Sequence, residues 1–355
     1  MTLIQGLLMG FGILVGILLI YLIVIIFFPI MTVPRQPIKT QTRKHNPKVN
    51  PPKFRHNVHF SVNEMDIDAW LYLPEETSQP APCVVMSTGI GGTKDCILED
   101  YAVRFVEAGL AVLTYDYRYF GDSEGEPRQN FDVSFQLDDL RAAIEYARSR
   151  DEIDPEKIIL WSTSAAGGYG LVLAAEDERI SAVISQCGAI DHKADDKIFM
   201  EREGMGFFLR LLAHAQRDKG RSRFGLSPHT IPIVGSPATL ALIRAPGAFD
   251  GYDNLMQNSN TFENEVCARL FFMKHGEDPL TASKKVQCPV LFLACEKDNL
   301  AAPDSFKRAA EALGDKAEVK IYPIGHFDIY EGEYFEKAIE EKITFLEKHL
   351  ELSAT

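Results

Sequence analysis

Positive charge is in short supply in this sequence of 355 residues. Lys and Arg number 37 against 50 Asp and Glu, so the formal net charge at pH 7 is −13. Proteins that bind nucleic acid through bulk charge carry an excess of bases, so we expect no nucleic-acid partner. Hydrophobic residues make up 46% and aromatic residues 10% of the chain, which excludes a disordered protein. The length allows one large α/β domain or two smaller ones.

Cysteine is also sparse, and the six residues are scattered without a CxxC pair or a metal-like spacing. Zinc sites and disulfide frameworks both need regularly spaced cysteines, so neither is suggested. A phosphate-binding loop is absent as well: residues 89–94 read Gly-x-Gly-Gly-Thr-Lys, but the required spacing of Gly-x-x-x-x-Gly-Lys-Ser/Thr is missing. We therefore expect no metal and no cofactor.

Charged side chains are missing altogether from residues 1–30, and residues 7–30 are almost wholly apolar. About 20 helical residues cross a bilayer core. A cleaved signal sequence would need a basic start, an apolar run of about 7–15 residues and a small-residue cleavage site. Here no base precedes the run, the run is longer, and residues 27–30 read Phe-Phe-Pro-Ile. The sequence predicts an uncleaved transmembrane anchor over residues 1–32.

Acidic residues are missing from the next segment, residues 31–57, which carries seven bases. The positive-inside rule then predicts a single-pass protein with residues 31–355 on the cytoplasmic side. Five prolines favour an extended, basic tether over residues 33–57, whose bases are attracted to anionic lipid headgroups. The rest of the chain holds 30 bases against 50 acids, a net charge of −20.

From residue 58 to residue 350 short apolar runs alternate with helical patterns. This alternation predicts a mostly parallel sheet with helices on both faces. A long interruption at about residues 192–287 exceeds a plain loop, and we interpret it as a mainly helical insertion over the strand ends, with a helix at 199–215. The expected strands are 58–60 and 67–73 (a hairpin), 82–87, 113–115, 158–161, 182–186, 290–294 and 319–322; the expected helices are 98–108, 137–150, 167–175, 304–313 and 333–350.

One strand end has the form of a nucleophile elbow, a strained turn that holds a serine where a helix begins. Residues 158–168 read Ile-Ile-Leu-Trp-Ser-Thr-Ser-Ala-Ala-Gly-Gly. The positions two before and two after the nucleophile must be small. Ser164 satisfies this, with Ser162 and Ala166 as its neighbours, whereas Ser162 would place Leu160 at such a position. Ser164 is therefore the candidate nucleophile.

An acid and a histidine follow in the chain order that such folds use. Asp298 lies just past the expected strand 290–294, with Glu296 as a nearby rival. His326 follows the last strand on a loop that begins with glycine. A serine hydroxyl needs a base to take its proton, and a carboxylate fixes the tautomer of that base. The tetrahedral oxyanion needs backbone donors. We expect these from the N–H of Ala165 and from the loop after strand 82–87, with Ile90 first and Gly89 next.

Four motifs together resemble the α/β-hydrolases, in particular dienelactone-hydrolase-like and X-prolyl-peptidase-like serine hydrolases. The resemblance implies a Ser164–Asp298–His326 triad and makes residues 116–125 a loop beside the site, with Arg118 in a structural role. Two departures are Thr88, where a histidine is usual, and the Ser162 and Ala166 positions, where glycine is usual. Residues 1–57 lie outside the resemblance. The motifs are residues 88–95, residues 116–125, the Ser164 turn and residues 325–332.

The function expected from these residues is that of a membrane-anchored serine hydrolase. It would cleave a carboxylic ester or thioester through an acyl-enzyme, and its partner would be a small-molecule acyl substrate. A membrane anchor favours lipophilic substrates. Two alternatives stay open: a serine peptidase of the X-prolyl type, and a binding module without catalysis. The acid-rich start of the insertion does not decide between ester and peptide (Asp195, Asp196, Glu201 and Glu203).

Overall fold

A computed structural model describes residues 3–28, 31–38, 51–75, 79–96, 98–257, 259–274 and 276–350. Residues 1, 2, 29 and 30 of the predicted anchor lie outside these ranges. So does much of the predicted tether, including its bases Lys39, Arg43, Lys44 and Lys48.

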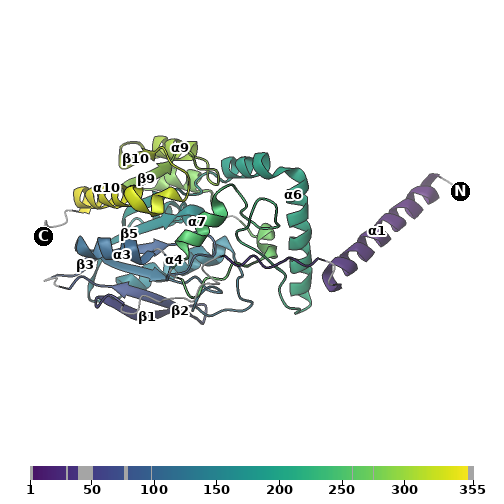
Figure 1. The fold of residues 1–355 in the computed structure, drawn as a ribbon, viewed down its shortest axis with the longest axis horizontal. Coiled ribbons are helices and arrows are strands. Elements are labelled where there is room, and N and C mark those ends of the chain that lie inside the picture. The colour runs from purple at the N-terminus through teal and green to yellow at the C-terminus, as the bar shows by residue number, and fades with distance from the viewer. Residues whose placement is uncertain are drawn as a thin grey trace.

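An eight-stranded sheet forms the centre of the molecule (Figure 1). Its spatial order is β1-β2-β4-β3-β5-β6-β9-β10, and β2 alone runs antiparallel to its neighbours. The chain passes from β3 to β4 on one side and then returns to β5 on the other side of β3. Such a switch point opens a crevice at the carboxyl ends of the two strands. The strands are β1 (Arg55–Val62), β2 (Met65–Tyr72), β3 (Ala81–Ser87), β4 (Ala111–Tyr115), β5 (Ile153–Thr163), β6 (Ile180–Gln186), β9 (Val290–Cys295) and β10 (Ala317–Tyr322).

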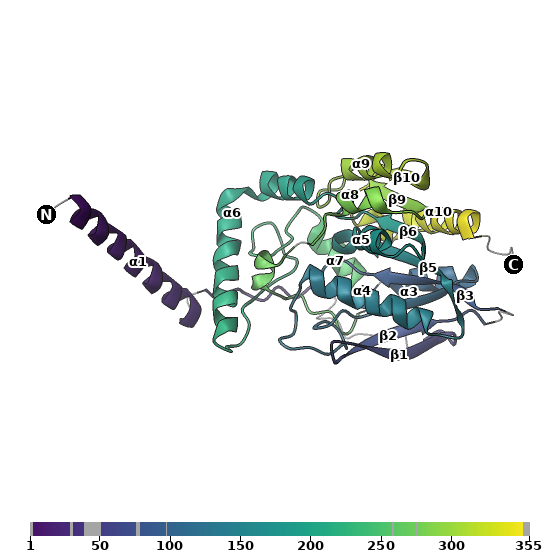
Figure 2. The ribbon, with the colours of Figure 1, turned by 180° about the vertical axis from the view of Figure 1, so that it is seen from behind.

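Helices cover both faces of this sheet (Figures 1 and 2). Helices α3 (Leu98–Glu107) and α10 (Gly332–Leu350) pack together on one face. The other face carries α4 (Val133–Arg148), α5 (Tyr169–Glu176) and α9 (Asp304–Leu313). The predicted α/β-hydrolase architecture, a mostly parallel sheet between helices, is thereby confirmed.

Successive side chains of β5 pack on opposite faces of the sheet. Trp161 turns toward α3, where its ring lies 5.1 Å from that of Tyr101. Ser162 turns the other way, and its hydroxyl lies 3.5 Å from the position that a side chain at Gly170 of α5 would occupy. Side chains of a strand point to opposite faces in turn. Strand β5 therefore ends at the crevice, where Ser164 follows it.

Some boundaries differ from those predicted. Strand β1 begins at Arg55, inside the segment assigned to the tether. Helix α4 begins at Val133 rather than at 137, because Asp132 caps it by accepting the N–H of Ser134. A side-chain cap extends a helix beyond its apolar pattern.

The insertion forms a cap dominated by one long helix, α6 (His192–Arg223), which bends at Gly204. The predicted helix at 199–215 is only its middle part. Two shorter helices, α7 (Ala248–Leu255) and α8 (Pro279–Ala282), follow along the chain. The sequence did not predict the small antiparallel pair β7 (Thr230–Ile231) and β8 (Val266–Cys267), because two residues are too few to establish a period.

Helix α1 (Leu3–Phe27) lies apart from the sheet and meets the molecule at α6 (Figures 1 and 2). Among the described residues it is the helix that is long and apolar enough to cross a membrane, judged by length and composition. Residues 31–38 then run along the cap, where Ile38 is buried and Arg35 pairs with Glu265 at 3.0 Å. The first part of the predicted tether is therefore packed against the cap.

Candidate active site

Ser164 directly follows β5 and has a left-handed backbone, with φ of 55°. This conformation is unfavourable for a residue with a side chain, by roughly 1–3 kcal/mol, and persists only where the surroundings impose it. Here two N–H groups hold the carbonyl oxygen of Ser164: that of Gly167 at 2.8 Å and that of Ala189 at 2.9 Å. The turn therefore lifts the Ser164 side chain into the crevice.

Close backbone approaches surround this turn. A Cβ at Gly167 would lie 2.2 Å from the Cα of Gly188, which follows β6. Sequence reasoning concentrated on Ser162 and Ala166, both buried here, and missed the Gly167–Gly188 contact. The glycine pair at 167–168 was the available signal, but its partner lies on another strand.

Ser164, His326 and Asp298 meet in one hydrogen-bonded chain. The hydroxyl of Ser164 lies 3.0 Å from Nε2 of His326, and Nδ1 of His326 lies 2.6 Å from Oδ2 of Asp298. The other oxygen of Asp298 accepts the N–H groups of Leu300 and Ala301, at 2.8 and 3.0 Å. Glu296 is exposed and takes no part in this chain. The three groups come from the ends of β5, β9 and β10.

Burial and charge act in opposite directions on His326, which is 4% exposed. Burial lowers the pKa of the imidazole, but the carboxylate of Asp298 raises it, and the net result is a pKa above the ordinary value. A carboxylate in contact with the ring stabilises the imidazolium. The pair Asp298–His326 is thus arranged to accept a proton from Ser164.

The loop after β3 lies against Ser164. A Cβ at Gly89 would come within 2.8 Å of the Cβ of Ser164 and 3.6 Å of the nitrogen of Ala165. Thr88, which stands where a histidine is usual, donates its hydroxyl to the carbonyl of Gly92 at 3.0 Å and so closes the loop on itself. Only a residue without a side chain allows this approach, which brings Ile90 beside the nucleophile.

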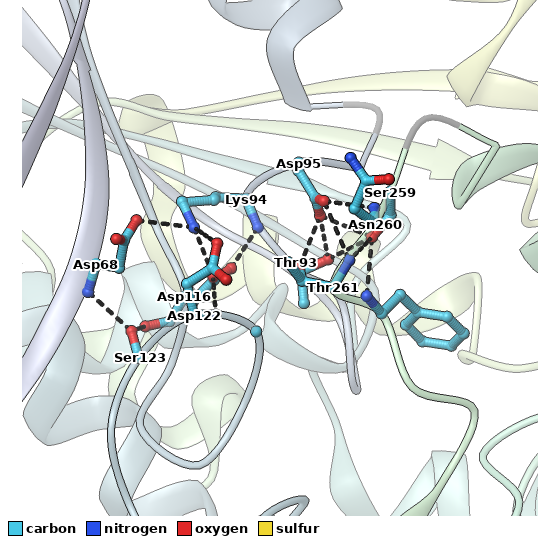
Figure 3. Close-up of polar contacts among 12 residues, drawn as sticks. Asp68, Thr93, Lys94, Asp95, Asp116, Asp122, Ser123, Ser259, Asn260 and Thr261 are labelled. Atoms are coloured by element: carbon cyan, nitrogen blue, oxygen red, sulfur yellow. Dashed lines mark hydrogen bonds and ion pairs between the residues drawn. The ribbon is translucent and has the colours of Figure 1, made fainter. Parts of the chain in front are cut away.

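A buried ion cluster anchors the end of this loop (Figure 3). Nζ of Lys94 lies 2.7 Å from Asp116, 2.8 Å from Asp68 and 2.9 Å from Asp122, and the side chain is 1% exposed. Burial lowers the pKa of Lys94, but the carboxylates outweigh it and raise the pKa. Lys94 therefore ties the loop to the strands behind it and is not presented to a phosphate.

The next residue, Asp95, ties the same loop to the cap (Figure 3). Its carboxylate accepts the hydroxyls of Thr93, Ser259 and Thr261 at 2.6, 2.7 and 3.0 Å, and the N–H of Asn260 at 2.6 Å. Sheet, loop and cap are thus connected through two adjacent residues.

A hollow of about 440 Å³ opens between the cap and the strand ends, and Ser164, Ala165, Ile90 and His326 all border it. A second hollow of about 40 Å³ lies beside the same serine and histidine. The larger wall is mainly apolar, with Phe199, Phe208, Leu242, Ile243, Leu270, Phe271, Met273 and Leu300. Its polar exceptions are Asp195, Asp196 and Arg202.

Asp195 is a functional candidate that sequence reasoning named only as one of several acids. Its Oδ1 accepts the N–H of Ala302 at 2.8 Å, so it holds the loop that carries Asp298. Its Oδ2 is buried and has no hydrogen-bond partner within the described part of the chain. Burial, helped by the charges of Asp191 and Asp298, raises the pKa of Asp195 to about 7. A carboxyl with this pKa offers a substrate both a donor and an acceptor.

Arg118 lies outside this hollow. It is buried and pairs with Asp139 at 2.6 Å. Over the described residues no group of three or more His, Cys, Asp and Glu side chains is arranged to hold a metal ion.

Comparisons with known proteins identify the family of this chain. The quorum-quenching protein AidA of Acinetobacter baumannii is 40% identical over 301 residues, which cover 84% of this chain and 96% of that protein. The thiohydrolase aneE of Aspergillus aculeatus is 25% identical, over 84% of this chain and 95% of its own length. The crystal structure of the α/β hydrolase GrgF from Penicillium has a TM-score of 0.69 at 25% identity, covering 84% of this chain and 99% of that one. A family model described as serine aminopeptidase, S33, matches residues 78–331. This chain therefore belongs to that family of α/β hydrolases.

Proposed function

We propose that the protein is a serine hydrolase that cleaves a carboxylic ester or thioester through an acyl-enzyme. The observation that carries this proposal is the chain of short contacts from Ser164 through His326 to Asp298, at the end of a strained turn. In this proposal Ser164 is the nucleophile, His326 the general base and Asp298 the group that orients the imidazole.

Acylation begins when Oγ of Ser164 attacks the carbonyl carbon of the substrate and Nε2 of His326 takes the hydroxyl proton. The resulting oxyanion accepts hydrogen bonds from the N–H groups of Ala165 and Ile90, which border the hollow. The bond to the alcohol or thiol then breaks, and His326 returns its proton to that leaving group. Water repeats the sequence on the acyl-enzyme and releases a carboxylic acid.

The shape and chemistry of the larger hollow support an acyl substrate of low polarity. Its wall is mainly aromatic and aliphatic, and its volume of about 440 Å³ is in the range of small-molecule sites. The name of the relative aneE, a thiohydrolase, supports thioesters as one substrate class.

An aminopeptidase is the second candidate, because Asp195 and Asp196 line the hollow and an acidic pair suits a peptide amine. Two observations weigh against it. The pKa of Asp195 is raised to about 7 by burial, which reduces its negative charge, and Arg202 borders the same space. The ester or thioester reaction is therefore the preferred proposal.

We also propose that α1 is an uncleaved membrane span and that the catalytic domain faces the cytoplasm. Support comes from the length and apolar composition of α1 and from the seven bases that follow it in residues 31–57. Bases flank the cytoplasmic end of a span in most single-pass proteins.

A fluorophosphonate probe tests the catalytic assignment, since it reacts with an activated serine. Wild type should be labelled and should hydrolyse p-nitrophenyl esters and acyl thioesters. Ser164→Ala should lose both properties, whereas Ser162→Ala, two residues earlier in β5, should keep them. Labelling that persists in Ser164→Ala would overturn the assignment. Absence of turnover on esters, thioesters and aminoacyl amides would leave the binding module as the better account, and turnover of amides alone would favour the peptidase.

A further inference from the structure

We propose that the outer face of the cap lies on the surface of an anionic lipid bilayer. This face consists of residues 205–226, which are the second part of α6 and the turn after it. We call this region the α6 face. The proposal rests on α1 being a membrane span, as proposed above, and adds a second, peripheral contact between protein and lipid.

Exposed apolar side chains concentrate on the α6 face. Met205, Leu209 and Phe224 are 58%, 56% and 61% exposed, and Leu226 is 37% exposed. Among the described residues beyond Phe28, only two other large hydrophobic side chains have comparable exposure, Phe272 and Ile321, and Phe272 is in a short helical turn that packs against α6. An apolar cluster on one side of a protein is typical of a surface that another phase or partner covers.

The charge of the α6 face is opposite to that of the rest of the domain. Its one acid, Asp218, is buried and bound to Arg269 at 2.6 Å, so it contributes little negative field. The domain beyond residue 57 carries a net charge of −20. Exposed cations are attracted to an anionic leaflet, so this face is attracted where the remaining surface is repelled. Of its five bases, Arg217 is buried against α1 and Arg221 is half-buried, while Arg210, Lys219 and Arg223 are exposed.

Helix α1 ends on the α6 face, and this contact sets the position of the face relative to the membrane surface. The guanidinium of Arg217 donates to the carbonyls of Phe28, at 2.8 Å, and Ile25. Arg221 donates to the carbonyl of Ile26 at 3.2 Å. The last carbonyls of a helix lack partners within the helix, and here two cap arginines supply them. The end of a span lies at the lipid surface, so α6 lies there too.

A ring contact extends this junction into the exposed cluster. The rings of Phe27 and Phe224 lie 5.2 Å apart, and Figures 1 and 2 both show α6 between α1 and the sheet. The same helix segment also contributes Phe208 to the wall of the larger hollow, and Phe199, before the bend at Gly204, contributes to it as well. One helix therefore separates the lipid surface from the candidate substrate site.

Tryptophan fluorescence in reconstituted full-length protein tests the proposal. The chain has two tryptophans, Trp70 and Trp161, whose emission forms a constant background. Leu209→Trp and Phe224→Trp should each add emission that brominated phospholipids quench in vesicles of phosphatidylcholine and phosphatidylglycerol. Ile321→Trp, at an exposed apolar position on β10, is the matched control and should not be quenched. Ester turnover checks that each variant is folded.

Two further measurements distinguish failure of the membrane span from failure of the lipid contact of the α6 face. Resistance to extraction at alkaline pH reports the anchorage of α1. If the protein is extracted, the membrane span itself is wrong; if it stays bound while Leu209→Trp and Phe224→Trp remain unquenched, only the lipid contact of the α6 face is overturned. The variant Lys219→Glu/Arg223→Glu should reduce quenching in vesicles with phosphatidylglycerol. An equal reduction in pure phosphatidylcholine would overturn the electrostatic part.

Discussion

At Ser164, backbone geometry and side-chain chemistry depend on each other. The positive φ that presents the hydroxyl is unfavourable in itself, and it is maintained by hydrogen bonds to the Ser164 carbonyl and by glycines at the closest approaches. Changes at those glycines should therefore affect the reaction without touching a reacting atom.

Substitution of Gly89 tests this dependence most directly. In Gly89→Ala the new methyl would lie 2.8 Å from the Cβ of Ser164, so the loop must shift and carry the N–H of Ile90 with it. Loss of one oxyanion donor typically lowers kcat by about 10²–10³, and we expect a decrease of that order in steady-state ester hydrolysis. Gly206→Ala, where the added methyl meets nothing within 4 Å, should leave kcat unchanged. An unchanged kcat in Gly89→Ala would contradict the placement of the loop.

The role of Asp298 should be visible in the pH dependence of the hydrolysis rate. The wild-type rate should fall as pH decreases through the pKa of His326, because the imidazolium cannot accept a proton, and Asp298 raises that pKa. In Asp298→Asn the pKa should drop, so the residual activity should extend to lower pH. The rate itself should fall by about 10⁴, as the wrong tautomer becomes favoured. Glu296→Gln is the control; an acid limb that shifts in this variant instead would identify Glu296 as the acid.

Sequence reasoning reached Ser164, Asp298 and His326 because each stands a few residues after a recognisable strand, in the order Ser, acid, His. The same reasoning could not find the contact of Gly167 with Gly188 or the orphan oxygen of Asp195. Both depend on which segments become neighbours, and a linear pattern contains no such distances.

At the scale of elements, the loop after β3 connects the sheet to the cap. Lys94 holds it to three carboxylates on two segments, strand β2 and the loop after β4, and Asp95 holds it to residues 259–261 of the cap. The position of the Ile90 N–H therefore depends on both connections.

Removal of the Asp95 carboxylate should loosen the cap. In Asp95→Ala the donors of Ser259, Asn260 and Thr261 lose their acceptor, and partly buried groups left unpaired cost about 1–3 kcal/mol. We expect a lower free energy of unfolding and faster amide hydrogen exchange in residues 259–262. The exposed Asp315→Ala should change neither quantity. Unaltered exchange in Asp95→Ala would show that other contacts hold the cap.

Element boundaries were predicted best where the apolar pattern is long and worst at caps and kinks. The parallel strands were found because continuous apolar runs are typical of buried strands. Helix α6 extends beyond its predicted middle part at both ends, because Asp191 caps its start and its last turns pack against α1. The contact between the two helices unites segments about 190 residues apart in the chain.

At the scale of the whole molecule, the net charge of −13 combines three parts of different character. An uncharged segment, a basic segment and an acidic domain follow one another, and the positive α6 face interrupts the acidic surface beside α1. The length of α1, the lack of a base before it and the residues at its end together predict a retained span rather than a removed signal sequence. Its junction with Arg217 and Arg221 favours retention.

The orientation across the membrane can be measured with an impermeant maleimide, because all six native cysteines are buried. In intact cells, Thr2→Cys should be labelled from outside, and Lys307→Cys, at an exposed position on α9, should be labelled only after the membrane is opened, as the positive-inside rule requires. The wild-type protein, which has only the six native cysteines, is the control for background labelling. The reverse pattern would place the hydrolase domain outside the cytoplasm.

The central claim is that Ser164 carries the acyl group during turnover. Rapid quenching during hydrolysis of a p-nitrophenyl ester, followed by peptide mass spectrometry, tests it most directly. We expect a burst of nitrophenol equal to the enzyme concentration and an acyl mass on the peptide that contains Ser164, with neither seen in Ser164→Ala. Turnover at the wild-type rate in Ser164→Ala, or an acyl mass on another residue that forms and decays at the turnover rate, would contradict it.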